Sequence, residues 1–382
     1  MRRRLWSVLV LALLIITADF WVGSSRRAAQ ISALAQSQPS ATLGLSLRPR
    51  AEGEFYLQRE GRSGATLFRG TARISPGDLI KPVPGRRVTV FCSDGTPRIL
   101  HEDIQHSLSS LGCPTNPQPS LERNGSRIRP PRNPVDPQVP YIISPRATTL
   151  LFGSKPTLRW HQARGANSYE VRIIRVDEGQ EEEVVWERKR FKETTVVPDN
   201  LSLQPGVTYL LTVKADNDKF SYDEGAGDTG FKVISEPETQ RIRMAKQQLD
   251  SLEMSDEAKA LVLAEFYADQ GLIFDAIQTL EDAITKRNQT AIIYRTVGDL
   301  YYSIGLGSEA KPYYCEAVKQ AEDSGNVEEQ ALALEQMGEV YALLGQKDEA
   351  IYWLRQASTK YELLGDLLHV QKLAERIEGL SL

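Results

Sequence analysis

One short pattern of small, aromatic and turn-forming residues returns three times between residues 255 and 377. Each copy has a small residue, an aromatic three positions later, a glycine four positions after that, and an alanine five positions further on. Apolar residues at helical spacing flank the glycine on both sides, so each copy predicts two amphipathic helices joined by a tight turn. The copies are Ala264, Tyr267, Gly271, Ala276; Gly298, Tyr301, Gly305, Ala310; and Gly338, Tyr341, Gly345, Ala350.

This pattern resembles the tetratricopeptide repeat, a helix pair of 34 residues that stacks on copies of itself. Gly298 follows Ala264 by 34 residues, whereas Gly338 follows Gly298 by 40, which is typical of the variants with longer helices. The predicted repeats cover about residues 256–286, 290–325 and 327–362, within a region of residues 237–382. Residues 367–380 carry apolar residues at the first-helix positions and predict a helix that caps the end of the stack.

The resemblance implies where a partner would bind. On the first helix of such repeats, the residue directly after the small one faces the concave groove, and here that residue is always a carboxylate. The neighbouring positions add an arginine, a tyrosine and further polar side chains. Unlike charges attract across an interface, so the stripe predicts a protein or peptide partner with a basic or neutral segment. The alternative is that acids at these positions serve only ordinary solubility. The predicted groove residues are Glu265, Arg295, Asp299, Tyr302, Glu335, Glu339, Gln371 and Glu375.

The N-terminus has the order of a secretory signal. Three arginines at positions 2–4 precede an apolar run over residues 5–18, and the small residues Ala33 and Ala35 stand before Gln36. This order predicts a signal peptide over residues 1–35 and a spacer over residues 36–43. An uncleaved membrane anchor through residues 5–23 is the alternative. Both predict an extracytoplasmic protein, in the periplasm or cell envelope, secreted or membrane-anchored.

Two β-rich regions are expected between the leader and the repeats. Residues 44–113 contain short apolar runs separated by turn signals and predict a small β domain of no assigned family. Residues 114–138 contain seven prolines and predict an extended linker. Residues 139–235 predict a β-sandwich, in which Tyr209 follows Pro205 and Gly206 and so resembles the tyrosine corner of fibronectin type III domains.

The chain has three cysteines. Cys92 and Cys113 lie in the first β-rich region, and in an oxidising compartment they are expected to form a disulfide, which would stabilise the fold by roughly 3 kcal/mol. Cys315 lies beside Tyr314 in a repeat helix and is predicted to be a buried free thiol.

No glycine-rich phosphate loop, nucleophile elbow or paired-cysteine motif occurs in the sequence. We therefore expect no enzyme, no cofactor and no metal, and the acidic C-terminal region argues against nucleic-acid binding. The predicted function is an exported, non-enzymatic scaffold that binds a partner segment in the concave groove. The alternative is a cell-envelope assembly or secretion factor that reads an extracellular polymer through its β domains.

Overall fold

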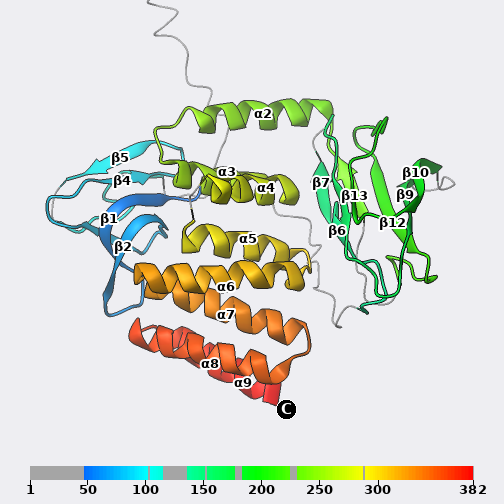
Figure 1. Cartoon of the computed structure of the whole chain (residues 1–382). Coiled ribbons are helices and arrows are strands. Elements are labelled where there is room, and N and C mark those ends of the chain that lie inside the picture. The colour runs from blue at the N-terminus through cyan, green and yellow to red at the C-terminus, as the bar shows by residue number, and fades with distance from the viewer. Residues whose placement is uncertain are drawn as a thin grey trace, which may run out of the picture. The chain divides into compact units, whose positions relative to one another are not determined.

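The computed structural model describes residues 47–101, 104–114, 136–150, 153–176, 183–223, 230–286 and 289–381. All of them fall within one compact unit, Leu45–Leu382. Within these ranges thirteen strands, β1–β13, precede eight helices, α2–α9 (Figure 1). The predicted combination of an N-terminal β-rich region and a C-terminal repeat-like helical region is thus confirmed.

The predicted location is corrected. Among the residues that the structure describes, no helix is long and apolar enough to cross a membrane. The predicted leader, spacer and most of the linker lie outside these residues, and no observation favours an extracytoplasmic site. The periplasmic or envelope assignment therefore no longer stands.

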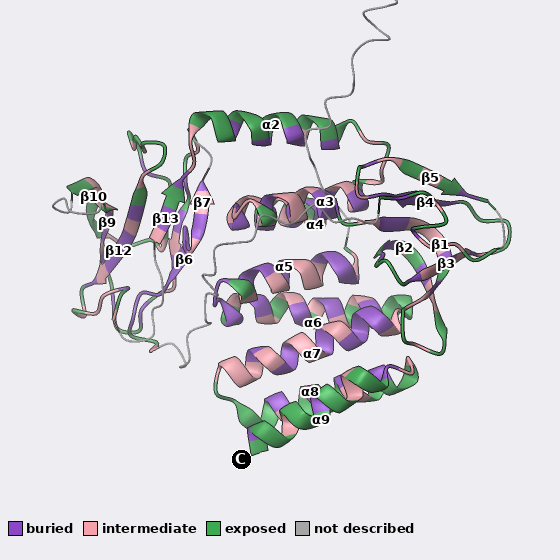
Figure 2. Cartoon of the chain, turned by 180° about the vertical axis from the view of Figure 1, so that it is seen from behind, coloured by how far each residue is buried: buried purple, intermediate pink, exposed green. Residues whose placement is uncertain are grey.

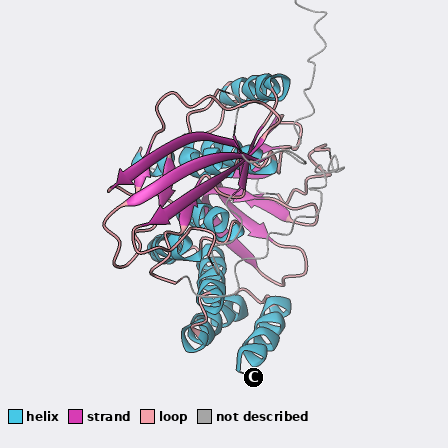
Figure 3. Ribbon diagram, turned by 90° about the vertical axis from the view of Figure 1, so that its right-hand side faces the viewer, coloured by secondary structure: helices cyan, strands magenta, loops and turns pink. Residues whose placement is uncertain are grey.

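The first sheet is antiparallel, with strand order β2-β1-β4-β5 and with β3 also paired to β1. Side chains alternate along β1, so Ala51, Phe55 and Leu57 enter the core of this region while Arg50 leaves the opposite face. The strands, coloured in Figure 3, are β1 Arg50–Gln58, β2 Ala65–Arg73, β3 Leu79–Pro82, β4 Val88–Phe91 and β5 Pro97–Leu100.

The predicted disulfide is confirmed. Cys92 and Cys113 are both buried in the core of the first sheet, and they are bonded to each other. Cys315, in contrast, is an exposed free cysteine, so the prediction of a buried thiol was wrong. The physical reason is the helical period, because the neighbouring Tyr314 occupies the core-facing position and turns Cys315 toward the surface.

The second β-rich region has two sheets around one core. One sheet has the order β10-β9-β12-β13-β7, and the other has the order β11-β8-β6. Trp160, Tyr169, Tyr209 and Phe231 pack between them, and the backbone N–H of Gln204 donates a hydrogen bond of 2.8 Å to the Tyr209 hydroxyl. The strands are β6 Ile142–Ser144, β7 Thr148–Leu150, β8 Leu158–Trp160, β9 Tyr169–Val176, β10 Glu183–Phe191, β11 Thr195–Val196, β12 Thr208–Ala215 and β13 Gly230–Val233.

The repeat helices form three pairs and one final helix, and their buried faces are turned toward one another (Figure 2). The small residues at the pair centres allow a close approach: a Cβ at Gly298 would lie 2.6 Å from the Tyr314 ring, and one at Gly338 would lie 2.6 Å from Leu354. The turn glycine Gly305 has φ +78°, a conformation that other residues adopt with strain. The helices are α3 Asp256–Asp269, α4 Ile273–Thr285, α5 Ala291–Ser303, α6 Gly307–Ser324, α7 Val327–Leu343, α8 Lys347–Leu363 and α9 Leu367–Ser381.

Helix α2, Glu236–Asp250, precedes the pairs and was not predicted. Its first turn carries a local signal that could have revealed it, because Ser235 and Glu238 form a reciprocal capping box. Ile242 joins the core of the repeats, and Leu249 packs with Leu47 and Val262. Helix α2 therefore covers the side of α3 that would otherwise end the stack.

Candidate functional site

The ribbon of strands β1 and β2 contacts the first helices of the repeats through arginine side chains. On α3, the carboxylate of Glu265 accepts a hydrogen bond of 2.5 Å from Arg50, and Asp269 accepts one of 3.1 Å from Arg48. Arg50 is 2% exposed, so its contact with Glu265 is shielded from solvent. Glu265, predicted to face a partner, therefore binds an arginine of its own chain.

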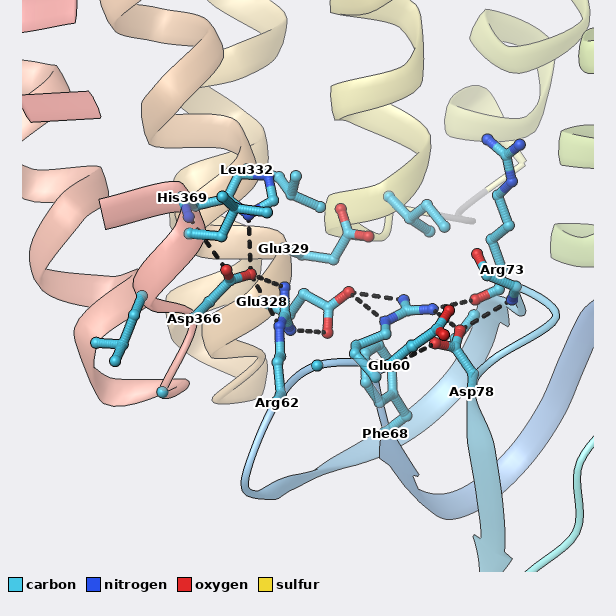
Figure 4. A pocket seen from close by; sticks show the side chains of 18 of the residues that line it. Glu60, Arg62, Phe68, Arg73, Asp78, Glu328, Glu329, Leu332, Asp366 and His369 are labelled. Atoms are coloured by element: carbon cyan, nitrogen blue, oxygen red, sulfur yellow. Dashed lines mark hydrogen bonds and ion pairs between the residues drawn. The ribbon is translucent and has the colours of Figure 1, made fainter. Parts of the chain in front are cut away.

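A second set of contacts involves the turn between β1 and β2. Arg59 donates to Glu328 at 2.6 Å and to Asp78 at 2.6 Å, while Arg62 donates to Glu328 at 3.0 Å and to Asp366 at 2.9 Å (Figure 4). Burial alone lowers the pKa of Arg59, but the two carboxylates outweigh it and hold that pKa above its ordinary value. The two arginines and three carboxylates thus form one connected, charge-paired network.

The acids of this network are placed by the helices that carry them. Glu328 lies in the first turn of α7, and Asp366 directly precedes α9, where it accepts a hydrogen bond of 3.2 Å from the backbone N–H of His369. Helix N-termini favour negative charge because their backbone N–H groups are unpaired. Burial raises the pKa of Asp366, but hydrogen bonds from His369 and Arg62 outweigh this effect and hold the pKa below its ordinary value, so the carboxylate stays charged.

A cavity of about 630 Å³ lies between the β1–β2 ribbon and the starts of α5, α7 and α9 (Figure 4). Its volume is in the range of small-ligand pockets. The wall combines the paired charges described above with Arg73, Arg295 and several apolar side chains. The apolar lining residues are Phe68, Ala72, Ile292, Leu332, Leu367 and Leu368.

The predicted groove residues on α5 are tied to their own neighbours. Arg295 donates to Glu329 at 2.7 Å and to Asp299 at 2.7 Å, and Asp299 also accepts a hydrogen bond of 2.9 Å from the Tyr314 hydroxyl. Burial lowers the pKa of Arg295, but the two carboxylates outweigh it and raise it above its ordinary value. Arg295 therefore remains a fixed positive charge that organises the acids around it.

The predicted groove residues on α7 and α9 also lie near one another. Glu339 accepts two hydrogen bonds of 2.8 Å from Arg376. The pKa of Tyr302, on α5, is raised mainly by burial and also by the negative charge of Glu339. Glu335 accepts a hydrogen bond of 2.6 Å from Tyr361. Glu375 accepts one of 3.1 Å from Gln371, and both of these side chains are exposed.

Carboxylates outnumber arginines among the predicted groove residues and their direct partners on α5, α7 and α9. They are Asp299, Glu329, Glu335, Glu339 and Glu375, against Arg295 and Arg376, which gives a formal net charge of −3. The predicted residues on α5, α7 and α9 thus pair with side chains of the repeats, whereas Glu265 pairs with Arg50 of the ribbon. In the described ranges, no group of three or more His, Cys, Asp or Glu residues is arranged to hold a metal ion.

Sequence reasoning missed the residues that contribute most contacts here. Arg50, Arg59 and Arg62 are separated from Glu265, Glu328 and Asp366 by more than 200 positions, so no local spacing could connect them. The available hint was charge: the N-terminal region is rich in arginine and the repeat region is rich in acids. That asymmetry is compatible with a contact between them but does not name the pairs.

Residues 289–362 match a protein family described as Tetratricopeptide repeat. The match covers the second and third helix pairs and confirms the resemblance read from the sequence. It lies outside residues 139–235 and so does not confirm the fibronectin type III resemblance. A comparison with functionally characterised proteins gave no match.

Several solved structures are similar to about a third of this chain. BtubC (BKLC) from P. vanneervenii is 17% identical, with a TM-score of 0.28, over 37% of this chain and 71% of that chain. The N-terminal domain of stress-induced protein-1 (STI-1) from C. elegans is 16% identical, with a TM-score of 0.29, over 32% of this chain and 98% of that chain. PcrH, solved in complex with the chaperone binding region of PopD, is 14% identical, with a TM-score of 0.29, over 36% of this chain and 92% of that chain.

Proposed function

We propose that this chain is a non-enzymatic scaffold for protein–protein interaction, which binds a basic or neutral segment of its partner in the concave groove of its repeats. Repeat arrays present extended surfaces of this kind. One observation carries the proposal: carboxylates on the first helices already hold arginine side chains. Glu265 binds Arg50, and Glu328 binds both Arg59 and Arg62.

The ribbon of β1 and β2 occupies only part of this surface. It pairs with Glu265 on α3 and with acids at the starts of α7 and α9. In the part of the chain that the structure describes, the carboxylates further along α7 and α9, including Glu339 and Glu375, have partners only within the repeats. A partner segment that carries arginine or lysine would therefore meet the same chemistry that the ribbon meets, at a place the ribbon leaves open.

Binding of a capped basic peptide, acetyl-Arg-Leu-Arg-Leu-Arg-amide, to the full chain tests this proposal by calorimetry. Glu375→Lys places a positive charge at an exposed groove position and should weaken binding about fivefold, the order of one exposed ion pair. Glu349→Lys makes the same change at an exposed position in the first turn of α8 and should leave the affinity unchanged. Absence of binding of the arginine peptide, or binding that is unchanged by Glu375→Lys, would refute the groove.

We also propose that residues 139–235 form a fibronectin type III-like sandwich that acts as a spacer or second binding module. Two features support it: the two sheets share one core, and the Tyr209 hydroxyl is held by the preceding turn at Gln204. A crystal structure with a different connection between the two sheets would exclude this family.

A further inference from the structure

Arg73, at the end of β2, is an exposed charged residue of the cavity wall. Its backbone carbonyl accepts a hydrogen bond of 2.8 Å from Arg59, but within the described residues its guanidinium group makes no hydrogen bond or ion pair. In Figure 4 this side chain points away from the network around Glu328. It is exposed, so a ligand entering the cavity can reach it.

Arg50 lies directly opposite Arg73 in the β1–β2 ladder, so both side chains leave the same face of the ribbon. Arg50 is 2% exposed, and among the described residues only its Nη2 has an acceptor, Glu265, while its buried Nε and Nη1 atoms have none. Buried donors are seldom left unsatisfied, because each one loses its hydrogen bonds to water. The arginine side of the interface therefore lacks acceptors.

The surrounding charges agree with this shortage. Burial lowers the pKa of Arg50; Glu265 raises it, but burial together with the charges of Arg295 and Arg48 keeps it below its ordinary value. Burial, Arg48 and Arg50 also lower the pKa of Arg73 and outweigh the opposite effect of Glu265 and Asp269. At the other end of the cavity the balance differs, because Arg59 and Arg62 are each bound to two carboxylates. An added negative charge would thus be favoured beside Arg73 rather than beside Arg62.

The remaining wall of the cavity is suited to an apolar group. Phe68, Ile292 and Leu332 line its inside, and Leu367 and Leu368 at the start of α9 are 73% and 60% exposed. Covering large apolar side chains that are exposed together at a cavity removes them from water, which is favourable. A volume of about 630 Å³ exceeds what a simple inorganic anion fills.

We propose that this cavity binds a carboxylate carried on an apolar group, with the carboxylate oxygens on Arg73 and the apolar group against Leu332, Leu367 and Leu368. Arg50, opposite Arg73 in the ladder, is paired with Glu265, and Arg295 is paired with Glu329 and Asp299, so neither needs to touch the ligand. Glu60 also lines the cavity and opposes the ligand's charge. The site goes beyond the proposed groove, which prefers the opposite charge, and the two can be tested separately.

The test compares two capped peptides, acetyl-Leu-Glu-Leu-amide and acetyl-Leu-Gln-Leu-amide, for binding to the full chain at constant ionic strength. We expect the glutamate peptide to bind at least tenfold more tightly, since it alone supplies a charge-assisted pair. Arg73→Gln should abolish this difference. Arg69→Gln, on the same strand, is the matched control: Arg69 pairs with Glu54 at 3.1 Å, does not line the cavity and is 65% exposed at its side chain, so the difference should persist.

Hexanoate distinguishes the source of the carboxylate. Competition by hexanoate supports a small carboxylic acid as the ligand of this site, whereas peptide binding without such competition supports an acidic segment of a protein partner. Equal binding of the two peptides, no binding of either, or a preference that survives in Arg73→Gln would overturn the proposal. None of these variants changes Glu375, so failure of this site is distinguishable from failure of the groove.

Discussion

Glu328 is the repeat residue that binds both arginines in the turn between β1 and β2. Its side chain is 6% exposed and it binds two arginines, Arg59 and Arg62, at distances of 2.6 and 3.0 Å. The substitution Glu328→Gln keeps the size of the side chain and removes the charge. We expect it to destabilise the protein by weakening the attachment of the ribbon to α7.

The magnitude follows from how many partners each arginine retains. Breaking a buried ion pair by neutralising one partner costs about 3–5 kcal/mol, because a buried charge loses its counterion. Here Arg59 keeps Asp78 and Arg62 keeps Asp366, so neither arginine is left without a carboxylate. The expected loss in the free energy of unfolding is therefore below that range, about 2–3 kcal/mol.

Urea unfolding measures this loss, and amide hydrogen exchange of β1 shows whether the ribbon itself has loosened. Glu322→Gln is the control, since Glu322 is an exposed residue of α6 whose neutralisation should change stability by no more than about 0.5 kcal/mol. If Glu328→Gln behaves like Glu322→Gln in both measurements, the network does not hold the ribbon and the reasoning fails.

Two further predictions concern the repeats. Gly298→Ala should lower the free energy of unfolding by about 1–2 kcal/mol, because its Cβ would lie 2.6 Å from the fully buried Tyr314 and overpacking outweighs the helix propensity gained. Gly379→Ala, where no atom lies within 4 Å, should be neutral or stabilising, and the same result at Gly298 would contradict the close packing. Burial raises the pKa of Asp275 to about 6. Since this pKa is raised in the folded state, the carboxyl contributes stability at low pH that is lost as the pH rises through about 6. Asp275→Asn should therefore stabilise the protein by about 1–2 kcal/mol at pH 7.5, an advantage that shrinks toward pH 4.5 in urea titrations, whereas a pH-independent advantage would refute the assignment.

The repeats could be predicted because their information is local. The small residue, the aromatic and the turn glycine each act within one helix pair, as Gly298 against Tyr314 and the positive φ of Gly305 show. The disulfide between Cys92 and Cys113 similarly joins residues that are close in sequence, with a separation of 21. Helix α2 was missed although the capping box of Ser235 and Glu238 was readable, because its buried residues have partners only once α3 is in place.

The candidate site also depends partly on local sequence and partly on tertiary contacts. The sequence by itself placed a row of carboxylates on the first helices, since a repeat fixes which positions share a face. Only the tertiary structure decided which of them remain open: Glu265 is covered by Arg50 from over 200 residues away, whereas Glu375 is exposed. The same folding buried Arg50 with unpaired donors and left Arg73 at the edge of a cavity. The physical reason is that the balance of buried charge depends on which surfaces pack together. No periodic pattern in the sequence specifies that the β1–β2 ribbon packs against the repeat helices.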